Sequence, residues 1–307
     1  MIAVVAFALI LTLCVNDHAE GAEYRVAVIM GLDETAFEGT LSGFQEELKK
    51  QGIKIYYDIY RIKGDPEKAR EAILRIKTSQ ANLILCLGSL AADAAAKEIT
   101  NIPILATLCL RLDAIKKAPN ATGISLEIPL ETQFKWVQRI AKDTKTVGVI
   151  YSNDENHKKV EAAARVASGM GMKLEAQEVS TPQDVTQALE KLSKKADILW
   201  TIADNLLSNP QIVKGIMLFS FKNKLPVIGL SLEWVKAGAL YSLDWDYKDL
   251  GEQCGELAQK ILGGASPSSL PPASPRKLTY SLNLNTAGQM KLNIAEELRH
   301  GAHKVAL

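Results

Sequence analysis

Short apolar runs alternate along this chain with segments whose apolar residues recur at the three- and four-residue steps of a helix face. In the first half, the strand-like runs occupy 24–30, 53–60, 82–87 and 103–108. The second half repeats the plan, with runs at 146–151, 173–179, 197–202 and 226–230. Strands that alternate with helices in this way predict parallel sheets with right-handed crossovers.

The stretch 227–251 contains one such unit and indicates where a ligand is expected. Its first run, 227–230, ends at a polar break, and the turn at 236–238 leads into a second short strand, 239–243. The helix that follows has one apolar face, made by Leu250, Cys254, Leu257 and Ile261. Ligands of open α/β sheets bind outside the carboxyl ends of the strands, so the loops after the strands are the candidate positions.

Two sheets fit within the 307 residues. The chain leaves the first sheet near 125–127 and returns near 243–246, and the Pro-, Gly- and Ser-rich stretch 263–275 indicates a surface connection. A strand at 277–285 then crosses back. We predict an α/β fold of two Rossmann-like parallel-sheet lobes joined by three crossovers. The predicted N-terminal lobe comprises 23–125 plus 246–276, and the C-terminal lobe comprises 126–245 plus 277–307.

The N-terminus predicts export. Residues 2–15 are almost wholly apolar and are followed by a small-residue zone at 19–22, which together predict a signal peptide over 1–22. No Lys or Arg precedes the run, so either the true start lies upstream or the signal is atypical. A buried N-terminal strand or helix is the structural alternative. Cys14 allows a lipid anchor, although Leu13 stands where a small residue is expected before a lipidated cysteine.

Charge and motif content narrow the function classes. Lys plus Arg total 36 and Asp plus Glu total 35, so no polyanion-binding surface is indicated and we expect no nucleic-acid partner. The chain has no GxGxxG, Walker, GxSxG, HExxH or CxxC motif, and we expect no enzyme activity, no cofactor and no metal site. His300 and His303 form an HxxH pair, but the tail 299–307 carries no packing signal and is expected to be frayed. Burial is expected for Cys86, Cys109 and Cys254.

Two positions are the leading binding candidates. Gly88 and Ser89 lie between a strand and a helix start, where backbone N–H groups and the helix dipole favour an anion, and the Ser89 hydroxyl adds a donor. The alternative is that Ser89 caps its own helix. Asp204 follows a buried-looking strand at the carboxyl edge, where a carboxylate can pair with a ligand ammonium. The alternative is that Asp204 caps the turn after it.

Other candidates carry less weight. Glu155 and Asn156 stand at the equivalent point of the second lobe, either facing the same cleft or acting as ordinary capping residues. Glu233 is expected on a loop and Asp246 at a crossover. Aromatic residues near strand ends could stack on a ligand ring, and these are Phe37, Tyr151, Trp200, Trp234 and Trp245. Core packing is the alternative, above all for Phe37 and Trp200.

Several segments together carry a resemblance to a known family. They are GSLAA at 88–92, NATG at 120–123, YSNDEN at 151–156, ADN at 203–205 and the unit from GAL to DYKDLG at 238–251. In this order and spacing they resemble type I periplasmic binding proteins, in particular the ABC-transporter substrate-binding family that includes tryptophan- and tyrosine-type amino-acid receptors. The resemblance to the family's Gly-Ser-small loop adds Leu90 to the candidate ligand contacts.

Two departures from the family pattern concern the ligand. The family often has an Asp or a Ser-Asp pair after the strand at 226–230, whereas this chain has SLEW at 231–234. The first loop, 31–38, also differs. Both segments are expected to line the cleft, so amino-acid specificity cannot be carried over from the family.

The resemblance implies an extracytoplasmic receptor that closes by hinge motion over a small ligand and delivers it to an ABC permease in the membrane. The residues predict a zwitterion such as an amino acid, with its carboxylate at Gly88 and Ser89 and its ammonium at Asp204 or Glu155. A nucleoside, sugar-like or aromatic solute is the alternative ligand, and ligand sensing for a signalling receptor is the alternative role. We expect a monomer in the periplasm or cell envelope.

Overall fold

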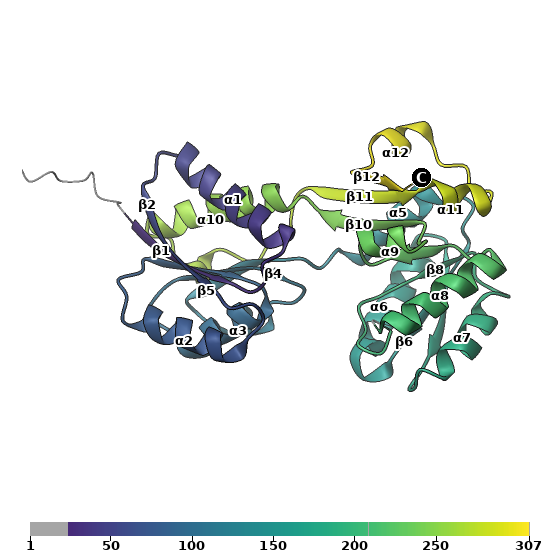
Figure 1. Cartoon of the computed structure of the whole chain (residues 1–307), viewed down its shortest axis with the longest axis horizontal. Coiled ribbons are helices and arrows are strands. Elements are labelled where there is room, and N and C mark those ends of the chain that lie inside the picture. Colours follow the sequence, from purple (N-terminus) through teal and green to yellow (C-terminus); the bar gives the residue numbers. More distant parts are fainter. Residues whose placement is uncertain (1–23, 208, 307) are drawn as a thin grey trace, which may run out of the picture.

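The computed structural model describes residues 24–207 and 209–306. The chain forms two lobes, each built around one open sheet, and extended connections join them (Figure 1). The predicted signal peptide and Cys14 lie outside the described residues. Within the described part, no helix is long and apolar enough to cross a membrane. The predicted α/β class with two sheets is confirmed.

The first lobe is built on a parallel sheet of five strands in the order β2-β1-β3-β4-β5. The strands are β1 (Tyr24–Met30), β2 (Ile55–Arg61), β3 (Leu83–Leu87), β4 (Ile104–Cys109) and β5 (Ala121–Ser125). All five residues of β3 and all six of β4 are buried. Central strands covered on both faces need apolar side chains on both sides, which explains their unbroken apolar sequence.

Helices cover both faces of this sheet. They are α1 (Thr35–Lys50), α2 (Pro66–Lys77), α3 (Ser89–Glu98), α4 (Asp113–Lys117) and α10 (Tyr247–Leu262), with a short 3-10 turn η1 (Pro267–Ser269). Helices α1 and α10 bury Phe44 and Leu250 in one core, and α2 and α3 bury Ile73 and Ala91 in the core on the opposite face. A helix from late in the chain therefore completes the first lobe.

Glycines allow α1 and α10 to pack backbone against backbone. A Cβ atom on Gly251 would lie 2.0 Å from the carbonyl oxygen of Thr40, and one on Gly43 would lie 2.0 Å from the carbonyl oxygen of Lys248. No side chain fits at either distance, so both positions require glycine. The helical periodicity predicted both helices but not this close contact.

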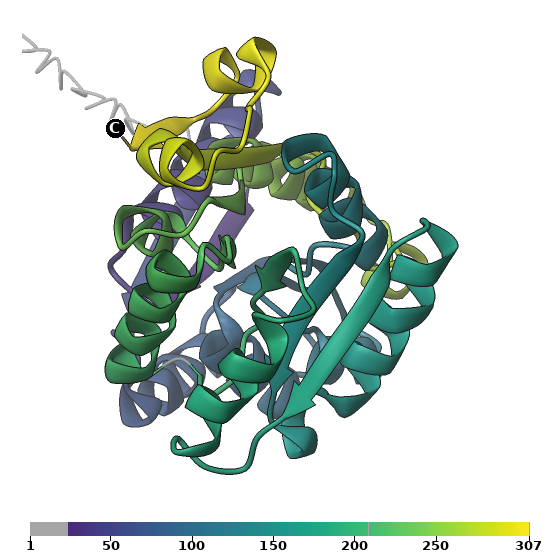
Figure 2. The ribbon, with the colours of Figure 1, turned by 90° about the vertical axis from the view of Figure 1, so that its right-hand side faces the viewer.

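The second lobe contains a sheet of seven strands in the order β12-β11-β10-β9-β8-β6-β7. The strands are β6 (Thr146–Tyr151), β7 (Lys173–Glu178), β8 (Ile198–Trp200), β9 (Val227–Gly229), β10 (Tyr241–Trp245), β11 (Leu278–Asn283) and β12 (Lys304–Ala306). Every pair is parallel except β10 with β11, because β11 returns from the first lobe directly alongside β10. Figure 2 views this lobe end-on, with helices on both sides of its strands.

The helices of the second lobe form two layers. They are α5 (Leu130–Ile140), α6 (Asn153–Gly169), α7 (Asp184–Leu192), α8 (Pro210–Asn223), α9 (Leu232–Lys236), α11 (Leu284–Gln289) and α12 (Glu296–His300). Helices α5 and α6 pack around Trp200 and Tyr241, together with α11 and α12. Helices α7 and α8 cover the other face, around Leu199 and Val227.

Two local predictions are wrong. The segment 299–306 is not frayed, because β12 pairs in parallel with β11 and His303 donates its N–H to the Tyr280 carbonyl at 2.8 Å. Pairing of backbone groups leaves no periodic signal in so short a sequence. Glu233 and Trp234 lie on the short helix α9, not on an extended loop. The prediction for the three cysteines is confirmed: Cys86, Cys109 and Cys254 are free and buried.

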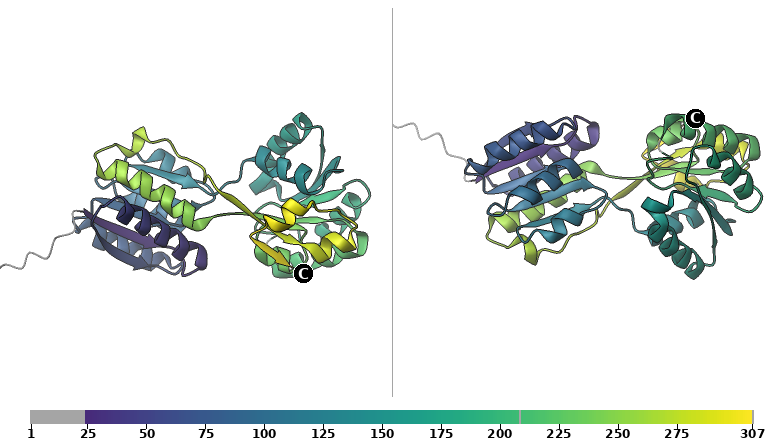
Figure 3. Two further views of the ribbon diagram at one scale, coloured as in Figure 1. Left: turned by 90° about the horizontal axis from the view of Figure 1, so that it is seen from above. Right: turned by 90° about the horizontal axis from the view of Figure 1, so that it is seen from below.

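Hydrogen bonds tie together the three connections between the lobes. The indole N–H of Trp245 donates to the Leu126 carbonyl at 2.9 Å, which links the second connection to the first. The Asp246 N–H donates to the Lys277 carbonyl at 3.0 Å, which links the second to the third. These hydrogen bonds link the three connections between the lobes (Figure 3), which we call the strip of connections. The predicted lobe boundaries at these points stay a prediction.

Candidate functional site

The candidate residues lie mainly on loops at the carboxyl edges of the two sheets, where ligands of α/β proteins bind. In the first lobe these loops follow β1, β3 and β4, and in the second they follow β6, β8 and β9. The structure groups the candidates into three places: the start of α3, the paired loops after β6 and β8, and a pocket beside α9.

The start of α3 presents backbone donors next to an exposed hydroxyl. Gly88 has a φ of +98°, a backbone conformation that favours glycine, and Ser89 is exposed as the first residue of the helix. A Cβ on Gly88 would lie 3.2 Å from the ring of Phe37, which is itself 8% exposed and packs in the core. Gly88 holds the N-cap position, so Ser89 does not cap α3. Leu90 is half-buried behind it.

The neighbour of Ser89 could not be predicted from the sequence. The thiol of Cys109 is buried there, and burial raises its pKa to about 11, while the neighbouring Ser89 hydroxyl acts in the lowering direction. Leu108 just before it has a φ of +58°, where the pairing of β4 with β5 shifts register. This irregular end of β4 leaves Leu110 with 56% of its surface exposed.

Asp204 is a hydrogen-bonded hub between the loops after β6 and β8. One carboxylate oxygen accepts from the Ser152 N–H at 2.8 Å, the Ser152 hydroxyl at 2.7 Å and the Asn156 side-chain amide at 2.9 Å. The other accepts from the N–H groups of Leu206 at 3.0 Å and Leu207 at 3.3 Å. Asp204 is only 3% exposed. The turn-capping alternative therefore has clear geometric support.

The surroundings of Asp204 keep it ionised. Burial acts to raise the pKa of its carboxyl group, but the hydrogen bonds from Ser152, Asn156 and the Leu207 N–H outweigh burial and hold the pKa below its usual value. A carboxylate with this many donors can remain charged inside the protein without a cation. Its assignment to a ligand ammonium stays a prediction.

The neighbours of this hub differ in what they can offer a ligand. Asn156 is 6% exposed and also donates to the Ala203 carbonyl at 3.1 Å. Tyr151 is 8% exposed, and burial together with the nearby Glu178 carboxylate raises the pKa of its phenol. The side chain of Glu155 lies outside the described part of the structure. Ser152 was missed as a partner because only the fold brings it to Asp204.

The two acidic candidates of lower weight have partners elsewhere. Glu233 is exposed and pairs with Lys236 on its own helix at 2.7 Å. Asp246 caps α10 by accepting from the Asp249 N–H at 3.1 Å and pairs with Lys277 at 2.5 Å. Lys277 and burial act in opposite directions on the Asp246 carboxyl, and the net effect lowers its pKa. Asp246 therefore lies in the strip of connections, as predicted.

Asp244 and Glu34 are two further acidic residues that were not among the candidates predicted from the sequence. The Tyr247 hydroxyl donates to Asp244 at 2.6 Å. Burial raises the pKa of Tyr247, and the charges of Asp244 and Glu34 act in the same direction. Glu34 directly precedes α1 at the carboxyl edge of the first sheet. The apolar pattern ended the second short strand at residue 243, which left Asp244 unassigned to the strand it belongs to.

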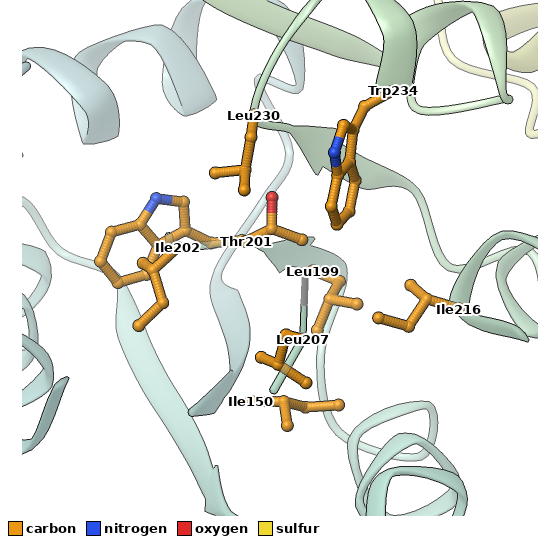
Figure 4. A pocket seen from close by; sticks show the side chains of 9 residues that line it. Ile150, Leu199, Thr201, Ile202, Leu207, Ile216, Leu230 and Trp234 are labelled. Carbon is orange, nitrogen blue, oxygen red and sulfur yellow. The ribbon is translucent and has the colours of Figure 1, made fainter. Parts of the chain in front are cut away.

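A small apolar cavity of about 10 Å³ lies beside α9, near the carboxyl ends of β8 and β9. Figure 4 shows Leu230 and Trp234 on either side of the Thr201 side chain. The remaining lining residues are Ile150, Leu199, Trp200, Ile202, Leu207 and Ile216. Of the predicted aromatic contacts, Trp200 and Trp234 line this cavity. Trp200 is 2% exposed and donates its indole N–H to Gln133 at 2.8 Å, as expected for a core residue.

These groups can bind a small polar molecule with an apolar part. They combine backbone and hydroxyl donors at Ser89, carboxylates near the strip of connections and the partly exposed apolar side chains of Leu230 and Trp234. Within residues 24–207 and 209–306, no cluster of three His, Cys, Asp or Glu side chains could hold a metal ion. The expectation that no metal is bound is not tested by this finding.

Comparisons with known proteins identify the family of this chain. The family model described as ABC transporter substrate binding protein matches residues 25–306. A protein described as tyrosine-binding, from Clostridioides difficile strain R20291, is 26% identical over 263 residues, which cover 82% of this chain and 75% of that protein. A protein of Rickettsia prowazekii with no described function is 25% identical over 266 residues, covering 85% of this chain and 84% of that protein.

Solved structures share the fold. The ligand-free, open form of a substrate-binding protein with adhesive properties from Clostridium difficile superposes with a TM-score of 0.80 at 24% identity. An ABC domain in complex with L-Trp from Streptococcus pneumonia superposes with a TM-score of 0.64 at 21% identity. Each alignment covers 92% of this chain and 99% of the other.

Proposed function

This chain belongs to the family of ABC transporter substrate-binding proteins, and from that premise we propose that it is an exported receptor that captures an amino acid between its lobes and passes it to an ABC permease. A relative at 26% identity is described as tyrosine-binding, which supports an amino acid over a sugar or nucleoside. The fold shared with a tryptophan-bound domain agrees with this proposal. The receptor performs no reaction on its ligand.

The observation that carries the proposal is the start of α3. An exposed Ser89 stands at the N-terminus of a ten-residue helix, next to a glycine with positive φ, at the carboxyl edge of the first sheet. Free N–H groups, the positive end of the helix dipole and a hydroxyl together suit a carboxylate. We assign the ligand carboxylate to this place.

We assign the ligand ammonium to a carboxylate other than Asp204 or Glu155, the two predicted from the sequence. Asp204 has its oxygens occupied by Ser152, Asn156 and two backbone N–H groups and is 3% exposed, so a ligand could reach it only by displacing them. Asp244 is half-buried in β10 of the second sheet and accepts a hydrogen bond from the Tyr247 hydroxyl. We assign the ammonium to Asp244, with Asp204 holding the adjacent loops in place.

Closure would follow from these assignments. A ligand favours the closed form only through contacts that it makes with both lobes at once. Ser89 belongs to the first sheet's edge, whereas Asp244 belongs to the second sheet. The strip of connections formed by Leu126, Trp245 and Lys277 would be the axis of that motion. The receptor would act as a monomer in the periplasm or cell envelope.

The test is to identify the bound molecule and then remove its predicted contacts. Protein purified under native conditions is denatured, the released small molecules are identified by mass spectrometry, and an amino-acid panel is screened by thermal shift. We expect an amino acid to be released or to raise the melting temperature. Ser89→Ala and Asp244→Asn should each weaken its binding roughly tenfold or more, with Glu233→Gln as an exposed acidic control. Selective stabilisation by sugars or nucleosides instead would refute the proposal.

A further inference from the structure

The amino-terminal edge of the second sheet carries a concentration of lysines. This edge lies opposite the carboxyl edge where ligands of such sheets bind. The segments at the starts of its strands are 142–145 before β6, 173–175 at the start of β7, 190–197 before β8 and 222–224 before β9. Together they hold eight Lys, no Arg and four acidic residues, which are Asp143, Glu175, Glu190 and Asp197. The near-equal charge totals of the whole chain do not reveal this local excess.

Strand pairing brings the four segments side by side. The strands are neighbours in the order β9-β8-β6-β7. At their amino ends, the Lys173 N–H donates to the Lys145 carbonyl at 2.8 Å, which joins β7 to β6. The Asp197 N–H donates to the Thr146 carbonyl at 2.8 Å, which joins β8 to β6, and β8 pairs in turn with β9. The lysines therefore occupy one continuous edge.

Most of these lysines have no carboxylate partner. Glu175 engages two of the eight, because its carboxylate oxygens lie 2.5 Å from the Lys173 ammonium and 3.7 Å from the Lys195 ammonium. The other six are exposed and form no ion pair within the part of the chain that the structure describes; they are Lys142, Lys145, Lys191, Lys194, Lys222 and Lys224. We call these six residues the lysine edge. Only three acidic residues of the same segments remain to oppose them, so the edge is positively charged.

Two exposed apolar side chains lie next to the lysine edge on α8. Leu218 is 63% exposed and Phe221 is 37% exposed. Both lie in the last two turns of α8, directly ahead of Lys222 and Lys224. The Phe221 ring packs on the turn before β10, where a Cβ on Gly238 would lie 2.5 Å from it. Lysines beside exposed Leu and Phe side chains suit the surface of an anionic bilayer, whereas a dissolved polyanion offers the apolar groups nothing to enter.

We propose that the lysine edge, together with Leu218 and Phe221, binds the surface of a membrane that contains anionic phospholipids. Lysines act as point charges that suit an extended negative surface, and the four segments contain no Arg for bidentate binding of a single phosphate. Such binding is weak, reversible and sensitive to salt. It would hold the receptor close to the membrane permease of the proposed function, but it depends neither on that function nor on the identity of the ligand.

Vesicle co-sedimentation of the full chain tests the proposal. Vesicles of phosphatidylcholine alone are compared with vesicles that also contain phosphatidylglycerol. The neutral vesicles report any binding by the apolar run 2–15, which has no Lys or Arg. We expect binding to the anionic vesicles to be about tenfold stronger or more at low salt and to decline as salt is added. Equal sedimentation with both kinds of vesicle, or none with either, would overturn the proposal.

Variants test the location. Lys145→Glu combined with Lys194→Glu should weaken binding to the anionic vesicles about tenfold or more. Lys68→Glu combined with Lys117→Glu is the matched control, because it makes the same change in net charge at exposed lysines of the first lobe. Leu218→Ser should weaken binding without a change in charge. Circular dichroism melts establish that each variant is folded.

Each variant has an outcome that contradicts the proposal. Equal losses in the two double variants would assign the binding to net charge and overturn the lysine edge. Unchanged binding in folded Leu218→Ser would overturn the assignment to a bilayer and leave a purely electrostatic partner, such as a dissolved polyanion.

Discussion

Ser152 donates both its backbone N–H and its hydroxyl to one oxygen of Asp204, at 2.8 and 2.7 Å. Ser152 directly follows β6 and Asp204 follows β8, so the pair fastens together two loops that the sequence separates. Asn156 strengthens the link by donating to the same oxygen and to the Ala203 carbonyl. These hydrogen bonds therefore hold the loops after β6 and β8 in place without a ligand.

Asp204→Asn should lower the free energy of unfolding by about 2–4 kcal/mol, because an amide cannot accept from all of these donors and leaves buried N–H groups unpaired. Equilibrium urea denaturation measures the change. Glu233→Gln, at an exposed carboxylate that pairs with Lys236, is the matched control and should change stability by less than about 0.5 kcal/mol. Equal effects of the two substitutions would contradict a structural role for Asp204.

Asp204 should also make stability depend on acid pH. Its folded-state pKa lies below the value of about 3.9 for an unfolded Asp. Between those two values the unfolded chain binds more protons, so this contribution is fully present above the unfolded pKa and is lost as the pH falls through the folded pKa. Urea midpoints measured from pH 7 down to pH 3 should fall more steeply for the natural protein than for Asp204→Asn. Parallel curves would show that other carboxylates cause the loss.

Gly251→Ala should destabilise the protein by about 2 kcal/mol or more, because the new methyl group would lie 2.0 Å from the Thr40 carbonyl oxygen. Gly215 on α8 is the matched control, since a Cβ there meets no atom within 4 Å. Gly215→Ala should instead stabilise by about 0.5–1 kcal/mol, because alanine favours a helix interior. Thermal melts of the two variants should shift in opposite directions, and shifts of the same sign would argue against the close helix contact.

Two buried tyrosines should respond differently to loss of the hydroxyl. The Tyr280 hydroxyl donates to the Leu298 carbonyl at 2.9 Å, whereas the Tyr241 hydroxyl is buried and has no hydrogen-bond partner among the described residues. Tyr280→Phe should cost about 1–2 kcal/mol, and Tyr241→Phe should be neutral or stabilising. Chemical denaturation compares them. A larger loss in Tyr241→Phe would indicate a partner for its hydroxyl.

The sequence predicted most of the fold because parallel strands buried on both faces must be apolar along their whole length. The runs at 82–87 and 103–108 correspond to β3 and β4 for this reason. The tail was misjudged because β12 is held through backbone pairing with β11, which places no demand on the order of side chains. Helix α9 is only five residues long, too short to display a periodic face.

Less of the candidate site than of the fold could be predicted from the sequence. Asp204 was placed correctly at a carboxyl edge, but its partner Ser152 is 52 residues away, and no local pattern reports that contact. The α9 pocket is made by residues from several elements, of which only Trp200 and Trp234 were candidates. Asp244 was passed over because a charged residue interrupted an apolar run, although it lies within β10.

The glycine contact between α1 and α10 also fixes an order of events in folding. Phe44 and Leu48 on α1 share their core with Leu250 and Cys254 on α10, yet α10 is synthesised only after most of the second lobe. A nascent chain that ends at residue 125 therefore has all five strands of its first sheet while one face lacks its second helix. The first lobe therefore cannot complete this core until most of the second lobe has been synthesised.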